Sequence, residues 1–249
     1  MGIPNNPDDH YPDVVAAGSL AAALLAIAAE SGPTFPVILS EANPLGRATV
    51  PSTVPHRNAM AINGYTWKRN WYIRGEEAFQ DMELIGGDTD DLAEIAKAAR
   101  AWHDGATLTD IRETASFVHL SGRFEVADND PAQLTASEWQ HMRIEAGEAD
   151  WPQYHELIEA AYAEPTLRVL YPFTSHWTLR FSTSTRPCLT PLPPCLAAPR
   201  REGRYTLNAH FMGDVITEAT TADEAVTALL SHMPSGLGTV TFGAAPQND

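Results

Sequence analysis

The segment from Tyr171 to Phe181 holds the densest group of side chains that could carry out chemistry. If it forms a regular strand, alternate residues face the same side, so His176 and Arg180 would project together. An imidazole that titrates near neutral pH and a guanidinium could orient and protonate a polar ligand there, with Glu164 as the carboxylate. Three further residues are predicted to bind the ligand: Tyr171, Thr174 and Ser175. The alternative interpretation is a solvent-exposed strand face over a buried aromatic pair.

A second group of aromatic and basic residues lies in the first half of the chain. Trp67 and Trp71 flank Lys68 and Arg69. If these side chains are exposed, the patch would suit recognition of a peptide, because aromatic rings offer a large contact area beside the positive charge. The run alternates only in part between apolar and polar residues, which predicts a strand with one solvent-exposed face.

Metal binding is suggested by two pairs with helical spacing. Glu138 and His141 are three residues apart and would share a helix face, with Glu145 a turn further on. His155 and Glu159 form a similar pair on the next expected helix. Carboxylate-bridged metal sites usually need this motif on two helices plus two more glutamates, and only one copy here has the right order. We therefore predict no metal site and interpret both pairs as solvent-exposed helix faces.

The common nucleotide-binding and nucleophile motifs are missing. The chain contains no Gly-x-Gly-x-x-Gly, no Gly-x-x-x-x-Gly-Lys-Ser/Thr and no Gly-x-Ser-x-Gly. At the glycine pair Gly86-Gly87, the neighbouring aspartates would repel a phosphate. These absences weaken kinase, ATPase and Rossmann interpretations, and no cofactor is predicted.

The composition indicates a folded, acidic protein. The 249 residues include 16 lysines and arginines against 32 aspartates and glutamates, which gives a formal net charge of −16. Nucleic-acid affinity depends on cations that displace counterions from phosphates, so a nucleic-acid partner is not expected. With 44% hydrophobic and 19% charged residues, the chain can bury enough apolar surface to fold.

The first residues and the two cysteines bear on location. The N-terminal sequence lacks the positive flank and cleavage pattern of a secretory signal, and the apolar stretch from Val14 to Ala29 is shorter than the roughly 20 residues that span a bilayer. We expect a cytoplasmic protein without a membrane partner. Cys188 and Cys195 match neither a redox pair nor a zinc motif, so two free thiols are expected, with a disulfide as the sterically allowed alternative.

Hydrophobic periodicity and capping residues predict the elements that position these groups. One long helix is expected from Pro12 to Ser31. Four strands should follow, with Asn63-Gly64 as a tight turn between the second and the third: residues 35–39, 58–63, 67–74 and 79–85. Gly86-Gly87 should end the last strand, before a helix from Asp90 to His103. The inward stripe of that helix comprises Leu92, Ile95, Ala99 and Trp102.

The second half repeats this plan after a helical insert. The insert is expected to contain helices at residues 107–114, 135–147 and 150–164, the second of them opened by a capping box at Thr135 and Glu138. Strands are then expected at residues 174–184, 205–211, 215–218 and 238–242, with a helix at 221–232. The proline-rich loop 187–199 is long enough to form a lid or a recognition surface.

These elements predict the α+β fold class, because helices and strands are mixed but segregated along the chain. The prediction is two small antiparallel-sheet-plus-helix modules with a helical insert between them. Residues 1–106 would hold the N-terminal helix and the first module, residues 107–165 the insert, and residues 166–249 the second module. One compact domain is the alternative.

Several stretches spread over nearly the whole chain carry a family resemblance. The most specific is Leu170–Ser182, which contains Thr-Ser-His-Trp; the others are Phe124–Val126, Leu134–Gln140, Glu164–Arg168 and Pro234–Gly238. Together they resemble an uncharacterised actinobacterial family, a domain of unknown function described as natural-product biosynthesis proteins. The resemblance implies a setting near secondary-metabolite genes, and it supplies no reaction, cofactor or catalytic residue.

Three functional hypotheses follow. The first is a cytoplasmic accessory protein of a natural-product pathway that binds a peptide, a carrier protein or an enzyme; open sheet edges would suit strand addition or a homodimer. The second is a cofactor-independent tailoring enzyme, such as a cyclase, isomerase or hydrolase, that uses His176 and Arg180. The third is an immunity-type inhibitor, since an anionic surface suits a basic toxin.

Overall fold

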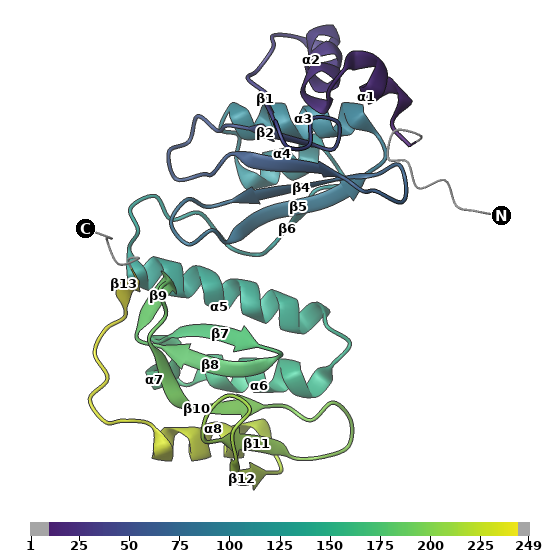
Figure 1. Cartoon of the computed structure of the whole chain (residues 1–249). Helices are drawn as coiled ribbons and strands as arrows, with labels where there is room; N and C mark the ends of the chain where they lie inside the picture. Colours follow the sequence, from purple (N-terminus) through teal and green to yellow (C-terminus); the bar gives the residue numbers. More distant parts are fainter. Residues whose placement is uncertain (1–9, 244–249) are drawn as a thin grey trace, which may run out of the picture. The chain divides into compact units, whose positions relative to one another are not determined.

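The computed structural model describes residues 10–243, which divide into two compact units between Ser121 and Gly122 (Figure 1). Both units combine antiparallel sheets with helices, which confirms the predicted α+β class. Among the residues described, no helix has the length and apolar character needed to cross a membrane. Of the helices in the predicted insert, the first belongs to the first unit and the other two to the second.

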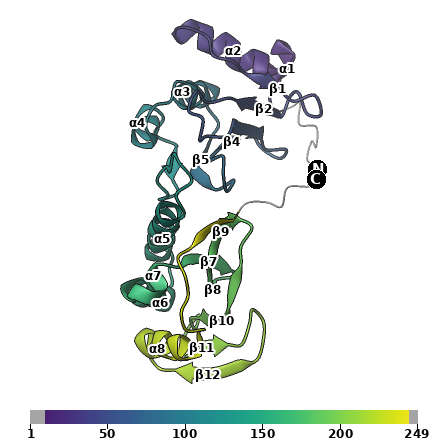
Figure 2. The ribbon, with the colours of Figure 1, turned by 90° about the vertical axis from the view of Figure 1, so that its left-hand side faces the viewer.

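The first unit is built on a six-stranded antiparallel sheet whose strands pair in chain order. The strands are β1 (Ile38–Leu39), β2 (Arg47–Val50), β3 (Met60–Gly64), β4 (Trp71–Glu76), β5 (Glu83–Thr89) and β6 (His119–Leu120). The helices are α1 (Pro12–Ala17), α2 (Leu20–Ser31), α3 (Leu92–His103) and α4 (Leu108–Thr114). Figure 2 shows α3 and α4 on one side of these strands.

The two faces of this sheet differ in burial. Along β4, Trp71 and Ile73 are buried in the core, whereas Tyr72 and Arg74 point to the other face and are exposed. The core also takes in the predicted inward stripe of α3, since all four of its members are buried: Leu92, Ile95, Ala99 and Trp102. The face of the sheet that carries Tyr72 is therefore the one available to a ligand.

The predicted helix over residues 12–31 is two helices. Gly18 ends α1 with a left-handed φ of 83°, which glycine adopts without steric cost. Ser19 then begins α2, because its hydroxyl accepts a hydrogen bond from the Ala22 backbone N–H at 3.0 Å. The segment therefore breaks into two helices at Gly18-Ser19, although its apolar residues keep a helical spacing throughout.

Two predicted turns of the first unit are also wrong. β3 continues through Gly64, and its connection to β4 comprises residues 65–70. Gly86-Gly87 lie inside β5 instead of ending it. Glycine is needed within this strand because a Cβ at Gly87, whose φ is 151°, would lie 2.5 Å from the carbonyl oxygen of Phe117.

The second unit contains a five-stranded antiparallel sheet in the order β12-β11-β10-β8-β7 and a parallel pair of β13 and β9. Its strands are β7 (Tyr171–Ser175), β8 (Thr178–Ser182), β9 (Ser184–Pro187), β10 (Pro191–Ala197), β11 (Tyr205–Asn208), β12 (Val215–Ala219) and β13 (Thr241–Gly243). Its helices are α5 (Pro131–Glu148), α6 (Pro152–Ala163), α7 (Pro165–Arg168) and α8 (Ala222–His232).

Helices cover one face of the second sheet. α8 contacts β10, β11 and β12, and α5 contacts β7, and Figure 2 shows the four helices on one side of the strands. The core between these layers includes Trp139, Leu157, Phe181, Leu196, Leu207 and Leu229. The opposite face of this sheet is partly covered, because Tyr171 and Phe173 on it are buried in a cluster with Val240, whereas Ser175, Thr178 and Arg180 are half-buried.

The predicted strand over residues 174–184 is a hairpin. β7 and β8 pair with Ser175 opposite Thr178, so His176 and Trp177 form the turn between them. Both residues have a positive φ. The turn could not be predicted from the sequence, because its two residues are neither glycine nor asparagine, the usual residues of such turns.

Helix α5 begins four residues earlier than predicted. Asp130 is its N-cap, with a carboxylate oxygen that accepts from the Ala132 backbone N–H at 3.0 Å, and Pro131 occupies the first turn. The predicted capping residues Thr135 and Glu138 therefore lie inside the helix.

The proline-rich segment from Pro187 to Pro199 is not a free loop. Most of it forms β10, which lies between β8 and β11 in the sheet. A lid from this segment is therefore ruled out. Cys188 and Cys195 are both free thiols, and burial raises the pKa of Cys195.

Candidate functional site

An open trough of about 600 Å³ lies over the exposed face of the first sheet. One part of its lining is aromatic, from Tyr65, Trp67 and Tyr72, and another part is ionisable, from Arg74, Glu83, Asp88 and His119. Gly86 lies in the floor, where a Cβ would be 2.7 Å from a carboxylate oxygen of Glu83 and 2.9 Å from the ring of His119. The absence of a side chain at this position leaves room for the charged groups beside it.

The aromatic part is a cluster of three rings. The ring centroid of Tyr65 lies 4.7 Å from that of Trp67 and 5.4 Å from that of Tyr72. Trp67 is 65% exposed and Tyr72 is 38% exposed, so ring surface remains open to a ligand. The ammonium nitrogen of Lys68 lies 5.2 Å from the Tyr65 centroid and adds a positive charge to the cluster.

Tyr11 fixes the loop of residues 65–70 that carries Trp67. Its hydroxyl lies 2.8 Å from the carbonyl oxygen of Tyr65 and 2.7 Å from that of Asn70, and it accepts from the Asn70 backbone N–H at 3.3 Å. Burial raises the pKa of Tyr11, which keeps the hydroxyl protonated as a donor. One buried hydroxyl thus holds both ends of the loop.

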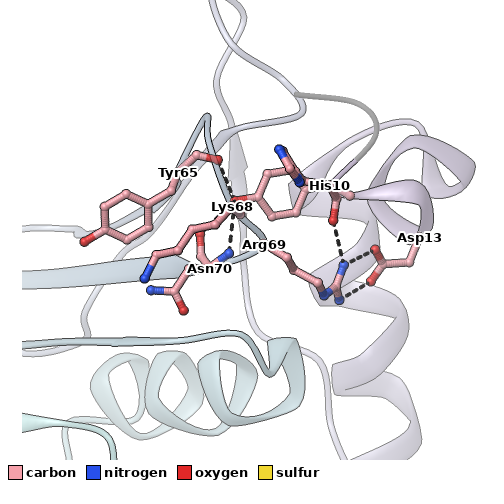
Figure 3. A network of polar contacts seen from close by, with 7 residues as sticks. His10, Asp13, Tyr65, Lys68, Arg69 and Asn70 are labelled. Carbon is pink, nitrogen blue, oxygen red and sulfur yellow. Dashed lines mark hydrogen bonds and ion pairs between the residues drawn. The ribbon is translucent and has the colours of Figure 1, made fainter. Parts of the chain in front are cut away.

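Arg69 joins the same loop to α1 (Figure 3). Its two terminal nitrogens donate to the two carboxylate oxygens of Asp13 at 2.7 and 2.9 Å. These hydrogen bonds lower the pKa of Asp13, so the pair stays ionised at neutral pH. The guanidinium carbon also lies 4.5 Å from the centroid of the Trp71 ring. Two contacts therefore hold the loop: the Tyr11 hydroxyl binds its backbone, and the Arg69–Asp13 ion pair joins its side chain to α1.

The ionisable part of the trough presents both signs of charge. The Nε of Arg74 lies 2.6 Å from a carboxylate oxygen of Glu76 and 3.5 Å from one of Glu83. The Nε2 of His119 lies 3.8 Å from the other oxygen of Glu83. Burial raises the pKa of Glu76, and the charge of Arg74 opposes that rise. These side chains could exchange their mutual contacts for charged groups of a ligand at little cost, because exposed ion pairs are weak.

The prediction that Trp67 and Trp71 share one exposed patch is wrong for Trp71. Trp71 is 0% exposed and packs against Tyr11, with ring centroids 5.0 Å apart, so it cannot contact a ligand. Sequence reasoning missed Tyr65 and Tyr72. Strand alternation could have predicted Tyr72. Successive residues of a strand point to opposite faces, so a buried Trp71 places Tyr72 on the solvent-exposed face.

In the second unit His176 and Arg180 both contact the Phe211 ring, and His176 lies in the turn between β7 and β8 instead of on the predicted strand face. The His176 imidazole stacks on the ring of Phe211, with centroids 5.6 Å apart and planes 23° apart. The guanidinium carbon of Arg180 lies 5.6 Å from the same ring centroid. Phe211 follows β11 in a distant part of the chain, and no local pattern connects it to the hairpin.

The other residues predicted for that site have separate places. Glu164 caps α7, since its carboxylate accepts from the Thr166 backbone N–H at 3.0 Å. Tyr171 is fully buried. Thr174 and Ser175 are half-buried on opposite faces of β7, and only Ser175 shares the face of Arg180.

The carboxylates considered as metal ligands form ion pairs. The buried Glu138 accepts from Arg123 at 2.6 and 3.0 Å, and Glu159 accepts from Arg143 at 2.7 and 2.8 Å. Within residues 10–243, no group of three or more His, Cys, Asp or Glu side chains is placed to hold a metal ion.

Comparison with known proteins bears on the second unit. Residues 133–244 match the model of a family of unknown function, DUF6193. No curated protein and no solved structure matches the chain. The β7–β8 hairpin lies within the matched range, whereas the aromatic trough, in residues 64–119, lies outside it.

Proposed function

We propose that the chain is an accessory protein of actinobacterial natural-product biosynthesis that acts in the cytoplasm by binding a peptide or protein partner, with the trough of the first unit as the recognition surface. The observation that carries the proposal is the exposed ring cluster of Tyr65, Trp67 and Tyr72 on a fixed loop and strand. The biosynthetic setting rests on the sequence resemblance.

The shape of the trough favours an extended polypeptide. It lies open over a sheet face, and its lining changes from aromatic rings to paired charges. Apolar side chains of a peptide would contact the rings, and polar or charged side chains would contact Arg74 and Glu83. Exposed aromatic anchors beside polar groups are the usual composition of a protein recognition surface.

The anchored loop favours tight recognition. Binding is weakened when side chains and loops must be ordered on association. Here the hydroxyl of Tyr11 and the bidentate pair of Arg69 with Asp13 hold the loop before a partner arrives. Trp67 and Tyr72 would therefore act as preorganised anchors.

The test is selection of peptides from a displayed random library on the full chain, followed by titration of the selected peptides. We expect Trp67→Ala to raise the Kd at least about tenfold, since truncation of an aromatic anchor often costs more than about 1.4 kcal/mol. The matched control is Met212→Ala, which removes another exposed apolar side chain, in the second unit, and should leave the Kd unchanged.

The biosynthetic setting is tested with the carrier proteins and enzymes encoded beside this chain. Native mass spectrometry should detect a complex with one of them that disappears in the Trp67→Ala variant. Failure to form any complex, or a complex that survives this substitution unchanged, would contradict the proposal.

A further inference from the structure

The turn of the β7–β8 hairpin has an unusual composition for its backbone. His176 and Trp177 have φ values of 50° and 67°, as in the two central positions of a type I′ turn. Asparagine and glycine normally take these positions, because side chains with a Cβ are strained at positive φ. Strain of this kind persists only where surrounding contacts hold the residue in place.

Aromatic contacts hold both turn residues. The Trp177 ring packs edge-on against Tyr154, with centroids 5.3 Å apart, and lies 6.0 Å from the ring of Trp151. His176 stacks on Phe211, with the ring planes 23° apart. The tip of the hairpin therefore displays an imidazole in a fixed orientation.

Arg180 contacts the same Phe211 ring as this imidazole. Its guanidinium carbon is 4.9 Å from the centroid of Phe173, its cross-strand partner, and 5.6 Å from that of Phe211. Within residues 10–243 it makes neither an ion pair nor a hydrogen bond, although it is half-buried. The aromatic rings contact its faces and leave its N–H donors free.

Two hydroxyls lie on the same face of the hairpin. Ser175 and Thr178 pair across the strands, and each is two residues from a member of the Phe173–Arg180 pair. In the part of the chain that the structure describes, neither hydroxyl has a hydrogen-bond partner. Among the described residues, a guanidinium and an imidazole that both contact Phe211, and two hydroxyls on the guanidinium's face of the hairpin, thus have no hydrogen-bond partner.

We propose that this hairpin-tip group, formed by Ser175, His176, Thr178 and Arg180, binds an oxyanion of a small ligand, either a phosphate or a carboxylate. Arg180 supplies the charge and a planar pair of N–H donors, which matches the oxygens of both anions. His176 and the hydroxyls supply further donors, and Phe211 offers an apolar surface for the body of the ligand. This site is in the second unit and does not depend on peptide binding in the trough.

The test is calorimetric titration of the full chain with phenyl phosphate and, separately, with benzoate, against sodium chloride at equal ionic strength. We expect saturable binding of phenyl phosphate or of benzoate. The compound that binds shows whether the site takes a phosphate or a carboxylate. Arg180→Gln should raise its Kd at least about tenfold, because the charged partner of the oxyanion is lost. The matched control is Arg204→Gln, which removes an exposed arginine paired with Glu218 and should leave the Kd unchanged.

A second variant separates ligand contact from folding. His176→Asn keeps a residue that tolerates positive φ, so the hairpin should remain folded while the imidazole is lost. We expect weaker binding with an unchanged circular dichroism spectrum. The proposal would be overturned if neither anion binds beyond the chloride baseline, or if Arg180→Gln binds as tightly as the unaltered chain.

Discussion

Tyr11 shows how much one hydroxyl can contribute to the trough. Tyr11→Phe removes the donor shared by the carbonyl oxygens of Tyr65 and Asn70 while it keeps the ring in the core. We expect it to lower the free energy of unfolding by about 1–3 kcal/mol, because buried carbonyl groups lose their partner. The measurement is equilibrium unfolding in urea.

Tyr72→Phe is the control for this substitution. The Tyr72 ring is partly exposed, and its hydroxyl has no hydrogen-bond partner within residues 10–243, so the change should stay within about 0.5 kcal/mol. Equal effects of the two substitutions would show that the Tyr11 hydroxyl does not hold the loop.

Glu138 illustrates a residue whose role only its partner reveals. From the sequence it is a helical carboxylate three residues before a histidine, which suggests a metal ligand. In the structure Arg123 occupies both of its oxygens, and both side chains are buried. A buried carboxylate that balances a buried guanidinium contributes to the fold, and removing one member of such a pair is strongly destabilising.

At the scale of elements, the start of α5 distinguishes the observed N-cap from the predicted one. Asp130→Ala should lower the free energy of unfolding by about 1 kcal/mol, because the Ala132 N–H loses its acceptor at the helix start. Thr135→Val should be neutral or slightly stabilising, since it replaces a buried hydroxyl that has no hydrogen-bond partner within residues 10–243 by a methyl group of similar size. Thermal or urea unfolding would measure both. A cap at Thr135 would reverse the two results.

The β7–β8 hairpin explains why strict alternation misled the prediction of one strand. A two-residue turn places Ser175 opposite Thr178, so the residues that share one face of the sheet are odd-numbered in β7 and even-numbered in β8. Within β8, Leu179 and Phe181 are buried in the core, and Thr178 and Arg180 lie on the other face. His176 left its predicted face because it belongs to the turn. Alternation of apolar and polar residues does not indicate where a strand reverses direction. The usual signal is a glycine or an asparagine in the turn, and this hairpin turn has neither.

At the scale of the molecule, each unit has its own hydrophobic core. The residues of one buried cluster all precede Ser121, and those of the other all follow Gly122. We therefore expect residues 122–249 to fold when they are produced alone, because a domain with its own core needs no other part of the chain. Circular dichroism during heating should show a cooperative transition for this fragment. A gradual transition, or a spectrum of an unfolded chain, would contradict independent folding.

The acidic and basic residues behind the net charge of −16 include side chains with distinct structural roles. Carboxylates cap helices at Asp91, Asp130 and Glu164, where they satisfy backbone N–H groups. Arginine side chains stack on aromatic rings at both candidate sites, as Arg69 does on Trp71 and Arg180 does on Phe211. Arg180 therefore keeps a positive charge that has no carboxylate partner among residues 10–243, whereas Arg69 is also paired with Asp13.

The sequence by itself determined the fold class and the inward stripe of α3, because these depend on the spacing of near neighbours along the chain. It also drew attention to Trp67, His176 and Arg180. Only the tertiary structure decided what surrounds them: Tyr11 reaches the loop of Trp67 from the N-terminal helices, and Phe211 reaches the hairpin from beyond β11. Such contacts join residues far apart in the chain, where local periodicity carries no information, and packing alone brings them together.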